Sequence, residues 1–421
     1  MIHKDKVLLE NFFSKIISYI EGQNSFDRYI EKYYEPEELA SKIKLQLEDK
    51  PEKDFLLLIS DYLKYSVRTG NKNFMNQLFG GFLLPGFISE VLIAVTNTSM
   101  YTYEVAPIAT LIEKEILNKI SKLIGYKNVE GTFVTGGSNA NLLSILCAIY
   151  NHDNKNKDFG ISARNKKYVM FVSDQAHYSY KKAAVITGLG LNAIIKIKTD
   201  PQGCMIPEEL ESKIIQNKDS IPLYVGLTAG TTVKGAFDPI EPIAKICQRH
   251  NIWMHVDASW GGGLLFSNRK NDYFCGSKYA DSFSLDGHKM LGIPLICSLI
   301  LLKNKNILHQ VNDVSGIDYL FHDEQEVSFN LGNFSLQCGR RVEATKMWLV
   351  WKYLGFIGIQ KRVDSLLEIT QLYKKIIDKY DDIELVTSIQ SVNICFRYAP
   401  DKTLSIKSLN QLNQSIRNYM M

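Results

Sequence analysis

Short apolar runs alternate with helix-like segments over the middle of the chain, from about residue 130 to residue 303. The apolar runs show no polar alternation, which is typical of strands buried on both faces of a parallel sheet. We expect strands at residues 167–172, 192–197, 222–227, 253–256, 282–285 and 297–302. Helix-like segments such as 207–216 and 239–250 separate the earlier runs. The alternation predicts an α/β domain with a central, mostly parallel sheet.

The segments on either side of this region have helical patterns. Residues 1–90 mix polar and apolar positions without a repeat, so we predict a helical arm or dimerisation segment there. A long helical stretch begins near residue 340, and a strand-like run follows at 393–400. We therefore predict an arm (1–90), a large α/β domain (91–345) and a small C-terminal domain (346–421).

Composition narrows the class of protein. The net charge of +4 is spread over 49 basic and 45 acidic residues, with no basic block interleaved with aromatics, which argues against a nucleic-acid partner. The longest near-continuous apolar run, 293–302, is about half of a membrane span, so we expect no membrane partner. Seven cysteines without C-x-x-C spacing indicate thiols in a reducing cytoplasm, and we predict no metal site.

Polar residues gather where the predicted strands end, which is where parallel α/β sheets bind their ligands. The segment "TFVTGGSNANLLSIL" predicts a strand, a glycine turn and a helix whose start, at Gly137 and Ser138, can bind an anion. An ordinary capped helix has the same pattern. His177 follows another strand and could stack on a flat ring, although an isolated histidine more often bonds to a local carbonyl.

Two further strand ends carry candidate groups. Thr232 lies in a glycine-flanked loop, where a turn with hydroxyl caps is the alternative reading. Asp257 directly follows the apolar run 252–256, so its carboxylate is partly buried and needs a cationic or N–H partner. A pyridinium nitrogen is one such partner. Three glycines at 261–263 allow the backbone to pack closely beneath a ligand.

Lys289 lies between the apolar runs 282–285 and 297–302, although lysine is rarely buried without a partner. A desolvated lysine loses its proton more readily and can form a Schiff base with an aldehyde. Pyridoxal phosphate needs such a lysine, an acid on its ring nitrogen and an anion site for its phosphate. Lys289, Asp257 and Ser138 can supply these three groups if the strand ends converge.

Eight motifs, in order from about residue 70 to residue 400, resemble the group II pyridoxal-phosphate-dependent amino acid decarboxylases of fold type I. The motifs are "TNTSMYTYEVAP", "TGGSNAN", "HYSYKKAA", "AGTTVKGAFDPI", "HVDASWGGG", "DGHKMLGIPLICS", "DYLFH" and "QCGRRVEATKMWLVWK". Within the group, the chain is most similar to the branch that acts on glutamate, aspartate and cysteine sulfinate. The resemblance implies pyridoxal 5′-phosphate as cofactor and a small acidic L-amino acid as substrate.

The resemblance implies a role for each matching residue. Lys289 would form the internal aldimine, Asp257 would pair with the protonated ring nitrogen, and His177 would stack on the ring face as a catalytic residue. Gly137, Ser138 and His288 would hold the phosphate. Thr232 would lie beside the cofactor.

The same resemblance implies roles on the substrate side. Tyr319 would match a loop tyrosine that protonates the substrate carbon after CO2 leaves and that reaches the partner subunit's active site, so a homodimer is expected. A surface aromatic is the alternative for Tyr319. Ser99 and Tyr101 would face the substrate side chain, and their pattern favours cysteine sulfinate or aspartate over glutamate. The alternative for Tyr101 is simple packing.

Three departures from the family pattern keep other functions open. Ser259 replaces an alanine, and Asp286 replaces an asparagine near the expected phosphate, where an anion must be paired or point away. The family continues into strands that carry a carboxylate-binding arginine, so we expect a truncated small domain, with Arg340 or Arg341 as a possible substitute. The alternatives are a catalytically impaired paralogue that still binds the cofactor, or another fold-type-I reaction such as that of an aldehyde synthase.

Overall fold

The computed structural model describes residues 3–23, 30, 32–47, 49–51, 53–76, 78–161, 166–314 and 328–420. Contacts between residues divide the chain into two compact units, Met1–Phe82 and Leu83–Met421. The three-part division into 1–90, 91–345 and 346–421 stays a prediction. Among the described residues, none of the helices combines the length and apolar character that crossing a membrane requires.

The first unit is helical, as the pattern of residues 1–90 predicts. It contains α1 (His3–Gly22), α2 (Pro36–Lys42) and α3 (Phe55–Tyr65). The Lys15 ammonium on α1 donates to Ser60 Oγ on α3 at 2.8 Å, and the Arg68 guanidinium donates to the carbonyl at the end of α1 at 3.1 Å. The first bond connects α1 to α3, and the second connects the end of α1 to the segment that follows α3.

The second unit is built on a seven-stranded sheet in the order β1-β7-β6-β5-β4-β2-β3. Its strands are β1 (Glu130–Val134), β2 (Tyr168–Ser173), β3 (Ile194–Ile197), β4 (Ile221–Thr228), β5 (Trp253–Ala258), β6 (Ser282–Asp286) and β7 (Ser298–Leu302). β7 runs antiparallel to β6 and to β1, and the other strands are mutually parallel. The prediction of a mostly parallel sheet is confirmed, and all six predicted runs form strands.

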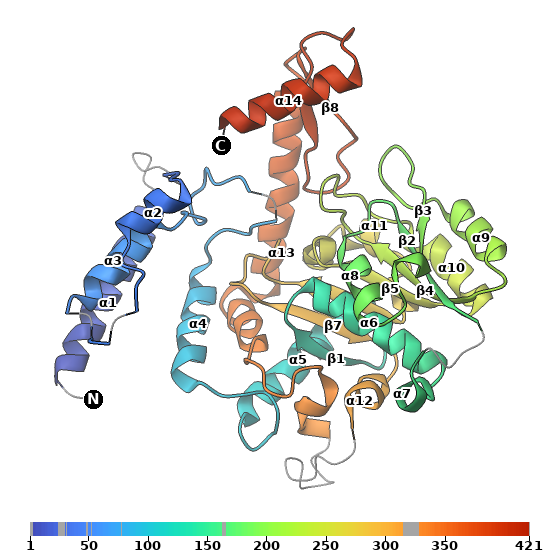
Figure 1. Ribbon diagram of the computed structural model, residues 1–421, viewed down its shortest axis with the longest axis horizontal. Helices are drawn as coiled ribbons and strands as arrows, with labels where there is room; N and C mark the ends of the chain where they lie inside the picture. Colours follow the sequence, from blue (N-terminus) through green and yellow to red (C-terminus); the bar gives the residue numbers. More distant parts are fainter. Residues whose placement is uncertain are drawn as a thin grey trace. The chain divides into compact units, whose positions relative to one another are not determined.

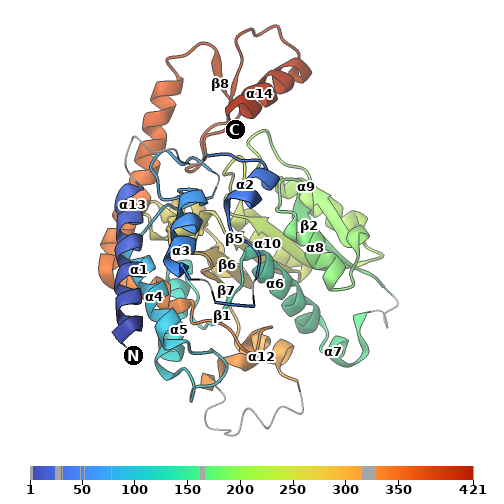
Figure 2. The same ribbon diagram turned by 60° about the vertical axis from the view of Figure 1, so that its left-hand side comes forward.

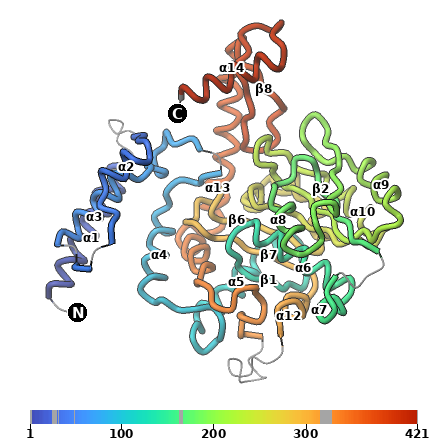
Figure 3. Tube along the Cα trace, viewed as in Figure 1, coloured from blue at the N-terminus to red at the C-terminus, as the bar shows by residue number. Residues whose placement is uncertain are grey.

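Helices cover both faces of this sheet, as Figure 1 shows. One face packs against α6 (Gly137–His152), α8 (Ser179–Ile186) and α12 (Ile307–Asn312). The other packs mainly against α5 (Pro107–Ile124), α9 (Pro207–Gln216), α10 (Ile240–His250) and the start of α13 (Ala344–Ile377). This unit also contains α4 (Leu84–Thr96), α7 (Asn156–Phe159) and α11 (Lys270–Phe274). In the trace of Figure 3 the labelled strands β1, β2, β6 and β7 lie close to one another, with α6 and α8 beside them.

The C-terminal part of this unit is small. Helix α13 is interrupted at Gly355, whose φ of 65° and ψ of 171° lie outside the helical region. Glycine adopts this backbone conformation without strain. It leads to an antiparallel pair, β8 (Ile383–Leu385) and β9 (Phe396–Tyr398), and then to α14 (Ile406–Met420). Figures 1 and 2 show α13 running from beside the large sheet to this small α/β element. The predicted strand at 393–400 is present as the shorter β9.

Candidate functional site

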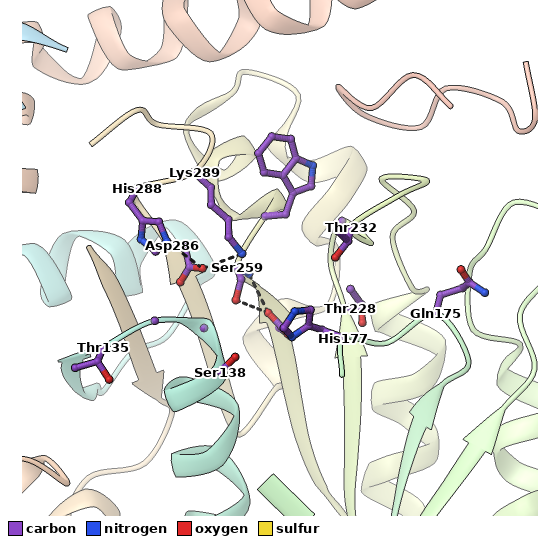
Figure 4. Close-up of a pocket in the computed structure, with 15 residues that line it drawn as sticks. Thr135, Ser138, Gln175, His177, Thr228, Thr232, Ser259, Asp286, His288 and Lys289 are labelled. Carbon is purple, nitrogen blue, oxygen red and sulfur yellow. Dashed lines mark hydrogen bonds and ion pairs between the residues drawn. The ribbon is translucent and has the colours of Figure 1, made fainter. Parts of the chain in front are cut away.

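The carboxyl ends of the parallel strands surround a cavity of about 210 Å³. Its walls come from the turns and loops that follow β1, β2, β4, β5 and β6. All seven residues predicted to contact the cofactor line it: Gly137, Ser138, His177, Thr232, Asp257, His288 and Lys289. In Figure 4 the Lys289 side chain reaches toward Asp286 and Ser259, and Ser138 lies at the start of a helix facing the same space. The structure thus gathers residues that are up to 152 positions apart in the sequence.

Asp257 supplies a buried negative charge at one wall of the cavity. It is the fifth residue of β5 and only 5% exposed. One carboxylate oxygen accepts hydrogen bonds from the Ser259 amide and hydroxyl at 3.0 and 2.6 Å, and the other accepts from Asn141 Nδ2 at 2.8 Å. Burial by itself raises the pKa of Asp257, but these bonds and the nearby His255 outweigh burial and lower it below its usual value. The carboxylate is therefore ionised and able to pair with a cation.

Lys289 lies in the turn between β6 and β7, and the pairing of Asp286 explains why it is tolerated there. The Lys289 ammonium is 3.0 Å from Asp286 Oδ2, and the other carboxylate oxygen of Asp286 accepts from Ser298 Oγ at 2.6 Å. Asp286 is thus a paired anion that faces the cavity. The Lys289 side chain remains 22% exposed, so its amine can meet a ligand.

Two histidines present neutral rings to the cavity. The Cys297 amide donates to His288 Nδ1 at 3.1 Å, and the Ser179 amide donates to His177 Nδ1 at 3.3 Å. Burial lowers the pKa of both imidazoles. Since His177 Nδ1 accepts a bond, the proton of that ring lies on Nε2, which can donate to a ligand. His288 Nδ1 also lies 3.2 Å from the Cys297 carbonyl oxygen, which can only accept, so its contacts with Cys297 do not fix which nitrogen of His288 carries the proton. His177 therefore accepts a hydrogen bond from a local amide, where a bond to a local carbonyl was the alternative expectation, and it also forms part of the cavity wall.

The glycine turn after β1 forms an anion-binding end of the cavity. Gly136 has a φ of 124°, which favours glycine. A Cβ on Gly137 would lie 2.2 Å from Ser259 Oγ, so only glycine fits between α6 and β5. The first backbone bonds of α6 run from Asn139 and Ala140 to the Gly136 carbonyl. The amides before them, at Gly137 and Ser138, stay free of helical acceptors and point their dipoles at an anion.

These groups fit pyridoxal phosphate. The cavity combines an amine for its aldehyde, a buried carboxylate for its ring nitrogen and a helix N-terminus for its phosphate. Thr228 Oγ1 also lines the cavity, is buried and has no hydrogen-bond partner among the described residues. Because buried hydroxyls normally have partners, this orphan group is consistent with a site that receives a polar ligand.

The structure does not bring the predicted substrate residues to the same cavity. Ser99 and Tyr101 lie in the loop between α4 and α5, and neither lines the cavity. The Tyr101 carbonyl accepts from the Gly332 amide at 3.0 Å, and the Met100 amide donates to the Arg340 carbonyl at 2.9 Å. Tyr319 lies outside the described residues. The roles of these residues stay predictions.

The two arginines considered as substitutes for a substrate-binding arginine are already paired. Arg340 donates two hydrogen bonds, of 2.7 and 2.6 Å, to the buried Glu113 carboxylate. Arg341 donates to Glu90 at 2.6 Å. Neither lines the cavity with Lys289. A substrate-binding role for either arginine stays a prediction.

Sequence reasoning missed several residues that complete the site. Asn141 is four residues after Gly137, so helical periodicity could have placed it on the cavity side of α6. Trp260 lines the cavity, and its indole N–H donates to Asn393 Oδ1 at 2.6 Å. That second contact joins the cavity wall to the C-terminal part of the chain. No local pattern predicts it, because the two residues are 133 positions apart.

Comparisons with known proteins agree with this geometry. The family model described as the pyridoxal-dependent decarboxylase conserved domain matches residues 36–399. Cysteine sulfinic acid decarboxylase from Mus musculus is 36% identical over 403 residues, which cover 94% of this chain and 81% of the relative. Acidic amino acid decarboxylase GADL1 from Xenopus tropicalis is 38% identical over 379 residues, which cover 88% of this chain and 73% of the relative. The crystal structure of mouse CSAD matches 99% of this chain and 89% of its own, with a TM-score of 0.94 and 34% identity.

Proposed function

This chain belongs to the family of pyridoxal-dependent decarboxylases, and from that premise we propose that it removes the carboxyl group of a small acidic L-amino acid. The enzyme class, the pyridoxal 5′-phosphate cofactor and fold type I are as the eight motifs predicted. The names of the two relatives, a cysteine sulfinic acid decarboxylase and an acidic amino acid decarboxylase, support an acidic substrate. The pattern around Ser99 and Tyr101 favours cysteine sulfinate or aspartate over glutamate. The observation that carries the proposal is the meeting of Lys289, Asp257 and the start of α6 in one cavity.

Each part of the cofactor has a residue of this chain to hold it. Lys289 would bind the aldehyde covalently, Asp257 would bind the ring nitrogen, and His177 would lie against the ring. The N-terminus of α6, with Ser138 and His288, would bind the phosphate. When bound, pyridoxal phosphate supplies an electron sink for the electron pair that remains when CO2 leaves.

The residues of the chain prepare this chemistry by charge and position. The ionised Asp257 carboxylate stabilises a positive charge on the ring nitrogen. The Asp286 carboxylate holds the Lys289 ammonium 3.0 Å away, which directs the amine toward the cavity before the cofactor binds. The Asn393 amide donates to the Thr232 carbonyl at 3.2 Å and so supports the loop that forms another part of the wall.

We also propose a homodimer in which Ser99, Tyr101 and Tyr319 of one copy act at the cavity of the other. Their predicted roles are on the substrate side, and Ser99 and Tyr101 do not line the cavity of their own chain. An exposed apolar stripe on α4 supports a contact with another surface, because such stripes on helices are normally covered. The stripe consists of four side chains that are 44–78% exposed at helical spacing: Leu84, Ile88, Leu92 and Val95.

A cytoplasmic location completes the proposal. All seven cysteines are free thiols, and three of them, Cys147, Cys247 and Cys297, are buried. Free thiols persist in reducing compartments, whereas oxidising ones favour disulfides. Fractionation of the cells that produce the protein would test this location directly.

The experiment that tests the function measures CO2 and amine from purified protein loaded with pyridoxal phosphate. Cysteine sulfinate, aspartate and glutamate are supplied separately, and Lys289→Gln is the matched control. We expect equal amounts of CO2 and amine from cysteine sulfinate or aspartate, and none from the control. An aldehyde in place of the amine would contradict the proposed reaction, and faster turnover of glutamate would contradict the proposed substrate order.

A further inference from the structure

A chain of hydrogen bonds runs through the protein interior beneath Asp257. The Trp253 indole Nε1 is 2.9 Å from Ser282 Oγ, which is 2.8 Å from His255 Nδ1. On the other side of the imidazole, His255 Nε2 is 3.0 Å from Asn141 Oδ1. The Asn141 amide nitrogen is in turn 2.8 Å from Asp257 Oδ2. All five residues are buried, so water does not compete for these bonds.

The two end residues fix the direction of donation along this series of hydrogen bonds. The Trp253 indole can only donate, and the ionised Asp257 carboxylate can only accept. The Asn141 NH2 group must therefore face Asp257, because its carbonyl oxygen there would set two acceptors against each other at 2.8 Å. Asn141 Oδ1 then accepts from His255 Nε2–H, and His255 Nδ1 accepts from the Ser282 hydroxyl.

His255 is neutral in this arrangement. Burial lowers its pKa to about 4, although the nearby Asp257 charge acts in the opposite direction. The Tyr224 ring stacks on the imidazole, with centroids 6.1 Å apart and an interplanar angle of 25°. Ser284 Oγ lies 3.5 Å from both His255 Nε2 and Asp257 Oδ1, too far to replace the bond to Asn141.

The same amide bonds to a second acceptor. Asn141 Nδ2 also donates to Ser179 Oγ at 2.9 Å, at the start of α8. If the Asn141 amide turned over, both acceptors, Asp257 Oδ2 and Ser179 Oγ, would lose their donor. The bond from His255 Nε2 to the amide oxygen opposes this rotation, since a turned amide would set its NH2 group against that N–H.

We propose that Trp253, Ser282 and His255 are positioning residues that fix the Asn141 amide, and that this keeps the Asp257 charge available for the ring nitrogen of the cofactor. The inference rests on the proposed function, because it assumes that Asp257 binds that nitrogen. It adds that the recognition of the nitrogen depends on a histidine that does not itself line the cavity.

The test compares two ligands that differ only at the ring nitrogen. Pyridoxal 5′-phosphate and 1-deazapyridoxal 5′-phosphate, in which C–H replaces that nitrogen, are titrated against the full-length protein, and the ratio of their dissociation constants is measured. Loss of overall packing weakens both ligands alike, whereas loss of the Asp257 interaction weakens only pyridoxal phosphate. The ratio therefore separates a positioning role from a merely structural one.

The variants are His255→Phe, His255→Gln, Ser282→Ala, Asp257→Asn and the control Tyr224→Phe. We expect His255→Phe to release the Asn141 amide and so to weaken its bond to the charged Asp257 carboxylate. The preference for pyridoxal phosphate should fall about tenfold, since bonds to charged groups have that size. We expect a reduction of about threefold in Ser282→Ala, which loses a neutral bond, and partial recovery in His255→Gln, which keeps an N–H donor. Tyr224→Phe removes a buried hydroxyl that bonds to Ser144, which is not part of the hydrogen-bond series from Trp253 to Asp257. This control should leave the ratio of dissociation constants unchanged.

Two outcomes would overturn the inference, and they are distinguishable. If Asp257→Asn abolishes the preference but His255→Phe and Ser282→Ala leave it intact, Asp257 is correctly assigned to the ring nitrogen. The hydrogen bonds beneath it then have no positioning role. If Asp257→Asn also leaves the preference unchanged, the assignment of Asp257 to the ring nitrogen fails and the inference fails with it. Ser282→Ala removes only one oxygen, so it gives a result even if His255→Phe does not fold.

Discussion

Two lysines of the second unit, Lys346 and Lys289, show how the surroundings of a side chain distinguish a structural lysine from a reactive one. Lys346, at the start of α13, is fully buried and contacts the carboxylates of Glu90 and Glu343 and the carbonyls of Pro294 and Ile296. Lys289 has one carboxylate partner, Asp286, and a side chain that is 22% exposed to the cavity. All donor capacity of the first lysine is used, whereas the second keeps capacity for a ligand. A lysine is thus expected to be reactive where it has an ion-pair partner but still has an N–H donor free for a ligand.

The largest expected difference is in activity. Lys289→Gln removes the amine that would bind the cofactor aldehyde but keeps a donor for Asp286, so turnover should fall by at least about 1,000-fold. The free energy of unfolding should change by about 1 kcal/mol or less. Steady-state CO2 release and urea unfolding on the same preparation check both. A variant that still turns over, or that unfolds, would break the comparison.

Lys346→Met should show the reverse. It removes the buried cation between the Glu90 and Glu343 carboxylates and leaves them only the exposed Arg341, so we expect the free energy of unfolding to fall by about 3 kcal/mol. The folded fraction should still bind pyridoxal phosphate. Urea unfolding followed by tryptophan fluorescence measures the loss. Unchanged stability would mean that the buried network is not a structural element.

His255, in the interior beneath the cavity, should make the free energy of unfolding depend on pH. Folded His255 has a pKa of about 4 against 6.5 for ordinary histidine, so below pH 6.5 the unfolded chain binds a proton that the folded chain does not. The free energy of unfolding should therefore fall as the pH is lowered from 6.5 toward 4, by about 3 kcal/mol in total. His255→Gln should remove this slope. Unfolding curves at several pH values test it, and parallel slopes in both proteins would contradict it.

The smallest effect concerns the anion beside Lys289. Asp286→Asn removes a negative charge from the cavity wall near the proposed phosphate site, so pyridoxal phosphate should bind about threefold more tightly. The binding of pyridoxal, which lacks the phosphate, should gain less. Equilibrium titration with both ligands measures the difference. Equal changes for the two ligands would place Asp286 away from the phosphate.

The sequence predicted the elements and the cavity residues better than their partners. Apolar runs without alternation identified the strands, and the polar residues that end those strands lie around one cavity because parallel strands share their carboxyl edge. The antiparallel direction of β7 was not predicted, because the hydrophobic pattern of a strand does not show which way the strand runs in the sheet. The short connection 287–297 could have indicated it, since a parallel return needs a longer crossover.

Contacts between distant residues explain what sequence reasoning missed. Arg340 pairs with Glu113 across 227 positions, and no local pattern carries that information. The same holds for His255 and Asn141, which are 114 positions apart and meet only when β5 and α6 pack together. By contrast, the bond from Ser259 to Asp257 spans two residues and explains the departure from alanine at that position.

The central claim is that Lys289, in the cavity formed by Asp257 and the start of α6, is the lysine that binds pyridoxal phosphate. Borohydride reduction of the loaded protein makes the bond between cofactor and lysine permanent, and peptide mass spectrometry then locates it. The account predicts one modified peptide, the one that contains Lys289, and none in Lys289→Gln. A modification on another lysine, or no modification after cofactor loading, would contradict it.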